Sequence, residues 1–253
     1  MSKATYVFIT SLLLFTGIRL AAQDTIMVPL HIRIGGDVAG PAGYLLNKDL
    51  KTFAVNGAFE FNEHVSFTGG TEFTHYSVKK PTYDYNSKGL TFTLGPEFNL
   101  LKPKISEGRY FIGVGIRYGV SVYSHETPRL EYTNAWGTTS LSLPSSTHMG
   151  HFIELTPGVR TEIFPGITLG WNMSLRMLLS DGTKSNLRPA YMPGFGDCSS
   201  RVSSGFSYYI SISIPYRTKR IITKPKTEDE DEEEIPAQED QTDKTNVLNS
   251  TTY

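Results

Sequence analysis

The stretch RVSSGFSYYISISIPYRTKR, residues 201–220, alternates apolar side chains with small or polar ones and then ends in basic residues. Side chains of a β-strand point alternately to its two faces, so Phe206 and Ile210 share one face and Ser207 and Ser211 share the other. In a soluble sandwich the apolar face would pack on a core, whereas in a membrane barrel it would face lipid. The rest of the chain has to decide between these two folds.

Seven more segments show the same alternation, at residues 30–38, 51–61, 65–74, 90–100, 110–123, 152–163 and 167–179. Connections after the second, fourth and sixth segments are short and the others are long, with polar loops expected at 77–88 and 124–150. This asymmetry is typical of outer-membrane barrels, whose tilted strands need about 9–11 residues. The sequence therefore predicts an all-β fold, an eight-stranded antiparallel up-and-down transmembrane β-barrel spanning residues 23–216.

The two ends of the chain differ from this body in composition. Residues 1–22 contain one lysine, an apolar run and a pair of alanines, which predicts a signal peptide. Residues 217–253 lack periodicity and run from a basic to an acidic cluster, which predicts a disordered tail on the periplasmic side of a bacterial outer membrane. The net charge of -1 argues against a nucleic-acid partner.

Charged residues of the strands fall on the face opposite the apolar rows, which is the interior of the predicted barrel. Isolated ions in such an interior are costly, so we expect Arg–carboxylate pairs. Side chains fill an eight-stranded barrel, which favours a structural network over a proton or solute path. His31 shares this face, and the predicted network consists of Arg33, Asp37, Glu60, Glu72, Glu97, Arg117, Glu154, Arg160, Glu162 and Arg176.

An acyl hydrolase that modifies lipid A is a weaker alternative. His75 and Ser77 share the lipid-facing side of one segment, at a spacing from which a base could reach a hydroxyl. A triad also needs a carboxylate that orients the histidine, and the carboxylate on the neighbouring segment, Glu97, is expected to point inward. The sequence therefore predicts a protein that is not an enzyme and has no catalytic residues.

No cofactor or metal site is predicted. His125, His148 and His151 have no carboxylate or cysteine at metal-ligand spacing. Cys198 is the single cysteine, so it has no disulfide partner, and we interpret it as a loop thiol without a role.

Four segments, GGDVAGP (35–41), YFIGVGIRYGVSVYSH (110–125), HFIELTPGVRTEIFPGITLGWNMSLRMLLS (151–180) and YMPGFGDCSSRVSSGFSYYISISIPYR (191–217), carry a family resemblance. The chain resembles an uncharacterised family of small outer-membrane barrels from Bacteroidetes, from the first alternating segment to the eighth. The resemblance implies an accessory role in outer-membrane protein assembly beside a small lipoprotein, and it implies no catalytic residues.

Together these features predict a non-enzymatic integral barrel of the outer membrane, in contact with membrane lipid. Its expected role is that of a structural or accessory subunit of an assembly or envelope complex, with the assembly machinery or a lipoprotein as partner. A barrel that binds or adheres through its surface loops is the alternative, ahead of the lipid A hydrolase. No small-molecule substrate is identified.

Overall fold

The computed structural model describes residues 24–183 and 188–223. The chain divides into a unit of residues 25–221, which holds the barrel, and a second unit of which only Asp24, Ile222 and Thr223 are described. The long strands are β1 (Asp24–Asp37), β2 (Leu50–Glu60), β3 (Val65–Lys79), β4 (Tyr83–Asn99), β5 (Tyr110–Asn134), β6 (Gly137–Phe164), β7 (Ile167–Ser180) and β10 (Val202–Thr223). Shorter elements are α2 (Ala39–Leu46), α3 (Pro103–Ser106), β8 (Tyr191–Met192) and β9 (Gly196–Asp197).

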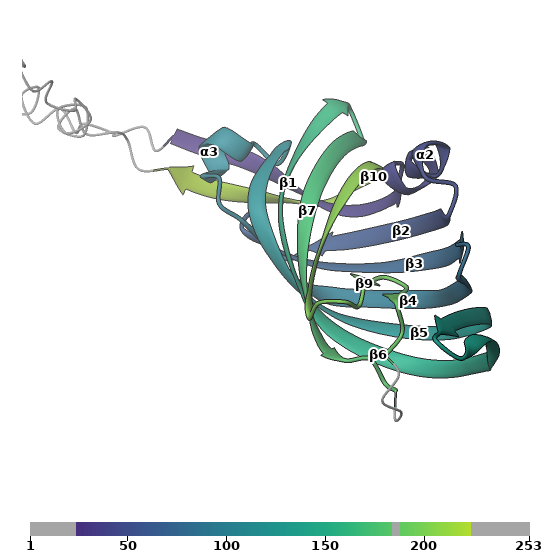
Figure 1. Cartoon of the computed structure of the whole chain (residues 1–253). Helices are drawn as coiled ribbons and strands as arrows, with labels where there is room; N and C mark the ends of the chain where they lie inside the picture. Colours follow the sequence, from purple (N-terminus) through teal and green to yellow (C-terminus); the bar gives the residue numbers. More distant parts are fainter. Residues whose placement is uncertain (1–23, 184–187, 224–253) are drawn as a thin grey trace, which may run out of the picture. The chain divides into compact units, whose positions relative to one another are not determined.

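The eight long strands form one closed barrel, in the order β1-β10-β7-β6-β5-β4-β3-β2 (Figure 1). Strands that follow one another in the sequence, from β1 to β7 and from β7 to β10, pair in antiparallel hairpins, and β1 closes the ring against β10. The predicted fold class, an eight-stranded antiparallel up-and-down barrel, is confirmed.

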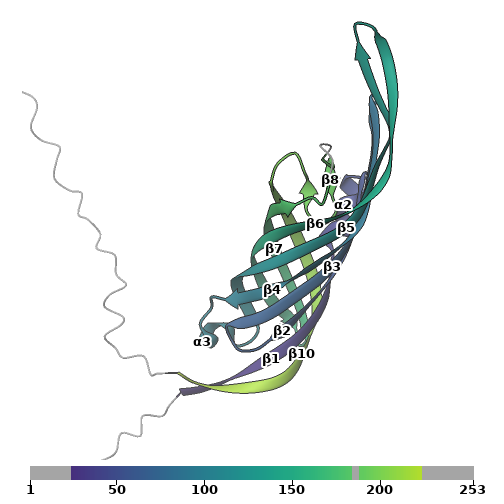
Figure 2. The same cartoon turned by 90° about the horizontal axis from the view of Figure 1, so that it is seen from below.

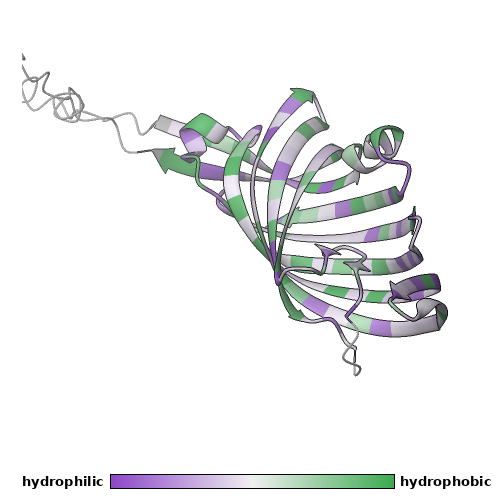
Figure 3. Cartoon of the chain, in the orientation of Figure 1, coloured by the Kyte–Doolittle hydropathy of each residue, from purple (hydrophilic) through white to green (hydrophobic). Residues whose placement is uncertain are grey.

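The wall of the barrel is apolar outside and polar inside. On β10, Phe206 and Ile214 are 61% and 54% exposed, whereas Ser211 and Ser213 are 3% and 6% exposed. Figure 3 shows the same alternation of hydrophobic and hydrophilic residues along the other strands. The apolar rows that the sequence predicts thus point away from the barrel, the opposite of their direction in a soluble sandwich.

The connections between strands gather at two ends of the barrel. At one end, here called the terminus end, lie the start of β1 and the connections 61–64, 100–109 and 165–166. At the other, the loop end, lie α2, the connections 80–82 and 135–136, and the described parts of the connection between β7 and β10, residues 181–183 and 188–201. The predicted signal peptide, residues 1–22, lies outside the described residues. So does the part of the predicted tail that begins at residue 224.

Two predicted loops are wrong. Strand β3 continues to Lys79 and β4 begins at Tyr83, so most of 77–88 is strand. Likewise β5 and β6 pair through most of 124–150 and leave only 135–136 as a turn, and their hairpin rises beyond the other strands (Figure 2). In the β5–β6 extension the side chains on both faces are partly or fully exposed, so alternation disappears from the sequence while the backbone pairing continues. The β3–β4 extension keeps buried residues on its inner face, namely Val78, Tyr85 and Ser87.

The predicted end of the barrel at Tyr216 is also wrong, because β10 continues to Thr223. Residues 217–223 therefore form strand, where the sequence predicts the start of a disordered tail. The hydroxyl of Tyr216 donates a hydrogen bond to the carbonyl of Glu60, and the ammonium of Lys219 lies 2.7 Å from the carboxylate of Glu63. These contacts join the end of β10 to the β2–β3 turn.

Candidate functional site

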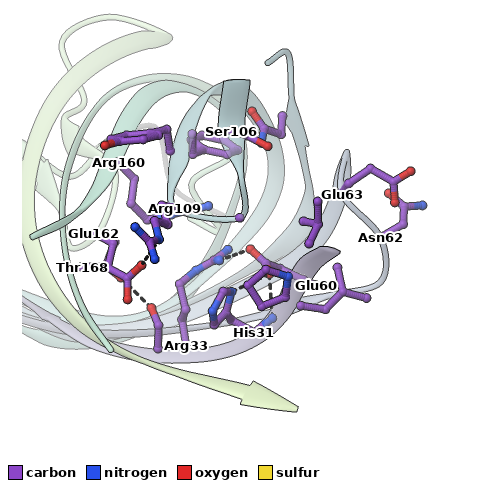
Figure 4. Close-up of a pocket in the computed structure, with 18 residues that line it drawn as sticks. His31, Arg33, Glu60, Asn62, Glu63, Ser106, Arg109, Arg160, Glu162 and Thr168 are labelled. Atoms are coloured by element: carbon purple, nitrogen blue, oxygen red, sulfur yellow. Dashed lines mark hydrogen bonds and ion pairs between the residues drawn. The ribbon is translucent and has the colours of Figure 1, made fainter. Parts of the chain in front are cut away.

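Inside the barrel, near the terminus end, four strands contribute one cluster of charges, here called the Glu97 layer. Arg33 of β1 pairs with Glu60 of β2, and its Nη2 atom lies 3.9 Å from Oε2 of Glu97 on β4. The same carboxylate oxygen accepts a hydrogen bond from Nη1 of Arg160 on β6 at 3.2 Å. His31 adds a contact of 3.2 Å from Nδ1 to Glu60. Figure 4 shows His31, Arg33 and Glu60 turned toward one another.

A second cluster, here called the Glu154 layer, lies on β5, β6 and β7. Arg117, Glu154 and Arg176 occupy directly opposed positions on these neighbouring strands. Nε of Arg176 donates to Oε1 of Glu154 at 2.9 Å, and Nη1 of Arg117 lies 3.8 Å from Oε2 of the same residue. One buried carboxylate therefore balances two guanidinium groups, and opposite charges on facing strand positions attract each other.

The remaining residues of the predicted network make other contacts. Asp37 accepts hydrogen bonds from the backbone N–H groups of Ala39 and Gly40 and from the hydroxyl of Ser207, so it holds the start of α2 against β10. Glu72 accepts a bond of 2.7 Å from the hydroxyl of Thr74. Glu162 accepts one from the N–H of Gly166 and lies 3.7 Å from Arg109, at the terminus end.

A cavity of about 100 Å³ touches both charged layers, which contribute Glu97, Glu154 and Arg176 to its lining. Nη2 of Arg33 and Oγ of Ser211 are buried without a hydrogen bond, and both residues line this cavity. A polar cavity needs roughly 10–15 Å³ to hold one water molecule. The interior therefore has the room and the polar partners for a few ordered waters.

At the loop end, residues 191–198 fold back into the barrel and close it; we call this segment the plug. Met192 and Phe195 are fully buried. Hydroxyls of Thr91 and Ser121 donate to the carbonyl of Pro193 at 3.0 and 2.7 Å. Gly194 has a φ of +75°, and a Cβ there would lie 2.2 Å from the Thr91 hydroxyl oxygen, so a side chain would not fit.

The predictions from the sequence do not include the entry of this connection into the barrel. A signal for the plug is present in MPGF, residues 192–195, where two apolar side chains flank a Pro-Gly pair within an otherwise polar connection. Apolar side chains are stabilised when they leave water. Their presence in a polar connection therefore indicates that the connection packs against another part of the protein.

The connection 100–109 closes the terminus end. It contains α3 and lies against β1: a Cβ at Gly108, whose φ is +72°, would lie 2.9 Å from the carbonyl oxygen of Pro29. Ser106, Val28 and Leu30 are buried where the two segments meet. The depression that remains there, drawn in Figure 4, has a volume of about 30 Å³. At each end of the interior, a segment of the chain therefore packs against the inside of the barrel.

Cys198 lies in a turn of the plug, in agreement with its interpretation as a loop thiol, but only 4% of its surface is exposed, which the sequence does not predict. Its Sγ atom lies 3.7 Å from the carbonyl oxygen of Gly196. Burial raises the pKa of the thiol to about 12. Because the thiolate is the nucleophile, such a cysteine reacts slowly.

We therefore expect Cys198 to resist alkylation by a maleimide in the folded protein at pH 7.5 and to react fully after unfolding. It is the single cysteine of the chain, so the mass increase reports on this thiol alone. Mass spectrometry before and after denaturation measures the reaction. Rapid labelling of the folded protein would contradict the burial of the plug.

The geometry of a hydrolase is not assembled around His75. Its cross-strand neighbours are Lys51 and Lys88, and no carboxylate among the described residues is hydrogen-bonded to it. The hydroxyl of Ser77 donates to Oδ1 of Asn86 at 2.7 Å instead of to a histidine. Glu97 points inward and pairs with arginines, as the alternation predicts.

The described residues form neither a metal site nor a membrane-spanning helix. In the parts of the chain that the structure describes, no group of three or more His, Cys, Asp or Glu side chains is placed to hold a metal ion. Neither helix among the described residues has the length and apolar character needed to cross a membrane.

The β5–β6 hairpin is the most prominent surface at the loop end. Trp136 at its tip is 93% exposed, and Tyr132 and Leu141 are also exposed. Arg129 fixes the base of the hairpin through contacts of 3.2 Å with Asp84 of β4 and with Glu131. The hairpin thus presents aromatic and aliphatic side chains on a paired, backbone-bonded support.

Comparison with curated proteins gives no match. Among solved structures, the chain is similar to Ail, the attachment invasion locus protein of Yersinia pestis, with 12% identity, a TM-score of 0.32, and coverage of 77% of this chain and 98% of that one. Neisserial surface protein A (NspA) gives 10% identity, a TM-score of 0.34 and coverage of 75% and 98%. CarO of Acinetobacter baumannii gives 11% identity, a TM-score of 0.35 and coverage of 75% of this chain and 98% of that one. At these values the similarity assigns no function to this chain.

A family comparison covers most of the sequence. The family described as Domain of unknown function (DUF6048) matches residues 1–219, which include every strand of the barrel except the last residues of β10. The chain therefore belongs to the DUF6048 family.

Proposed function

We propose that this protein is a non-enzymatic integral barrel of the bacterial outer membrane. The support is the wall itself, because large apolar side chains such as Phe53, Phe92 and Ile212 are more than half exposed on its outer surface. Burial of apolar area is worth about 25 cal/mol per Å². A wall of this kind is therefore unfavourable in water and favourable in lipid, while the charged groups point inward.

The closed interior carries the functional conclusion. The plug packs into one end and the connection 100–109 into the other, and side chains fill the interior of an eight-stranded barrel, so we infer that the protein acts through its surfaces and not as a solute path. We infer that it serves as a structural or accessory subunit of an envelope complex. The resemblance to small barrels of Bacteroidetes supports outer-membrane protein assembly as the process, with the assembly machinery or a lipoprotein as partner.

One observation favours the second candidate, a barrel that binds a partner through its surface. The β5–β6 hairpin carries Trp136 at an exposed tip, and tryptophan is enriched among the residues that dominate binding energies. A hairpin held by backbone pairing loses less conformational entropy on binding than a flexible loop would.

Trimming this hairpin is expected to separate the two candidates. Leu130 and Leu141 are cross-strand partners, so residues 131–140 can be replaced by an Asn-Gly turn without disturbing the pairing below. If the hairpin is the binding surface, the trimmed protein will lose the partners that co-purify with the full chain after gentle detergent extraction. If the barrel is a subunit held through other surfaces, the partners will remain.

Quantitative proteomics of the extracts measures the result, with Arg201→Gln as a control at the loop end outside the hairpin. A wild-type barrel that purifies without any stable partner would contradict the subunit proposal. A mature protein that stays in solution without detergent would contradict the membrane location itself.

A further inference from the structure

Three neighbouring strands place basic side chains in one line on the outer wall near the loop end. Lys51 of β2 lies opposite His75 of β3, and His75 lies opposite Lys88 of β4. We call these three residues the basic row. Both lysines are exposed and the histidine is half-buried, as expected for side chains that point outward.

The basic row marks the upper border of the apolar wall. Two residues further along the same strands lie Phe53, Phe73 and Leu90, which also face one another and are 59%, 49% and 39% exposed. Strands rise about 3.4 Å per residue, so the two rows are separated by about 7 Å along the strands. If the apolar wall contacts acyl chains, the basic row lies at the depth of the headgroups.

Helix α2 supports the same depth from a different part of the chain. It packs against β2 at the loop end, and its last residues, Leu45 and Leu46, are 79% and 92% exposed. Exposed leucines beside a lysine-bearing surface suit the boundary between headgroups and acyl chains.

A depression of about 380 Å³ adjoins the basic row. It is lined by Tyr44, Lys48, Asp49, Lys51, His75, Ser77 and Lys79, so three lysines face one carboxylate. The ammonium of Lys51 lies 5.1 Å from the centre of the Tyr44 ring. This concave surface joins the end of α2 to the outer faces of β2 and β3.

The positive charge of this surface is not neutralised by the described part of the chain. Lys48, Lys51, Lys79 and Lys88 take part in no ion pair there. Asp84 is the cross-strand partner of Lys79, and its carboxylate is engaged by Arg129 at 3.2 Å. With three lysines and one carboxylate, Asp49, the depression keeps a net positive charge, which attracts an anion.

We propose that the depression and the basic row bind the phosphate groups of lipid headgroups in the outer leaflet. This inference rests on the proposed membrane location. Lysine binds phosphate as a point charge, and three lysines line this depression. The ligand is a lipid rather than a soluble phosphate, because its acyl chains would continue along the exposed side chains of Phe53, Phe73 and Leu90.

Native mass spectrometry of the detergent-solubilised full chain tests the proposal. Phosphatidic acid, which carries a phosphomonoester, serves as the probe. Phosphatidylcholine with the same acyl chains serves as the comparison of zero net charge, because its choline balances the charge of its phosphodiester. The double variant Lys51→Gln/Lys79→Gln is expected to bind phosphatidic acid at least about tenfold more weakly than wild type, since each lysine near an anionic headgroup strengthens binding severalfold. Arg188→Gln/Arg201→Gln removes the same charge from the loop end outside the depression and is expected to bind like wild type.

Equal binding by wild type and the lysine variant would overturn the proposal, and so would equal affinity of wild type for the two lipids. Competition by glycerol 3-phosphate at the concentration of the lipid would show that the ligand is a soluble phosphate and would overturn the lipid assignment. The need for detergent distinguishes a failure of the headgroup site from a failure of the proposed membrane location. If all variants require detergent but none prefers phosphatidic acid, the headgroup site fails and the membrane location stands.

Discussion

Replacing Glu97 with alanine is expected to lower the free energy of unfolding by about 3–5 kcal/mol, the usual cost of leaving a buried charge without its partner. Its carboxylate lies 3.2 Å from Arg160 and 3.9 Å from Arg33, and side chains of all three residues are almost completely buried. The hydroxyl of Ser66 loses its acceptor as well. Arg33 keeps Glu60, but Arg160 has no other carboxylate within ion-pair distance among the described residues.

Urea titration in detergent micelles, followed by tryptophan fluorescence, measures this effect. Glu63→Gln is the matched control, because it breaks the more exposed pair with Lys219 and should cost no more than about 1 kcal/mol. Adding Arg160→Leu to the Glu97→Ala variant should restore part of the stability, since the unpaired charge is then gone. Equal losses for Glu97→Ala and Glu63→Gln would show that the buried network is not stabilising in the way the contacts indicate.

Replacing Phe195 with alanine is expected to release the plug while the barrel stays folded. Its ring is fully buried and lies 6.0 Å from that of Phe152, and removal of a buried phenylalanine costs about 3–5 kcal/mol. The backbone pairing of the wall does not depend on the plug. The free energy lost with the Phe195 ring should therefore favour release of the plug and not unfolding of the barrel. An opening equilibrium shifted by this amount rises about a hundredfold to a few thousandfold.

The alkylation rate of Cys198 reports this opening directly, because the thiol lies in the same segment. The rate should rise by the same large factor in Phe195→Ala, and a protease should cut within residues 181–201. Trp136→Ala is the control: its side chain is 93% exposed, so the labelling of Cys198 should not change. An unchanged rate in Phe195→Ala would mean that the plug is held mainly by the hydrogen bonds to Pro193.

The interior charges illustrate how far the sequence reaches into the candidate site. Alternation alone places Arg117, Glu154 and Arg176 on the inner face, but it does not fix the register between strands. Opposition of these three residues, and the separation of Glu97 and Glu154 into two layers, follows from the pairing of whole strands. Without the register of the strands, the sequence therefore identifies the charged residues of the interior but not which of them contact each other.

The plug and the surface depression were missed for a related reason. Residues 191–198 are held by side chains of β4, 102 and 104 positions earlier in the chain, and of β5, 72 positions earlier. The basic row joins Lys51, His75 and Lys88, which are unremarkable as single residues in the sequence. Contacts between segments so far apart leave no local pattern that a reading of one segment could detect.

The sequence by itself determined the strands within the wall and the direction of their faces. A wall between an apolar exterior and a polar interior imposes a two-residue period on every strand that crosses it, and this period is visible in residues 201–214 as in the other seven segments. Only the tertiary structure decided the strand extensions of β5 and β6, the closure of both ends and the pairing of charges. These depend on neighbours brought together by the closed ring, and a period along one strand carries no information about them.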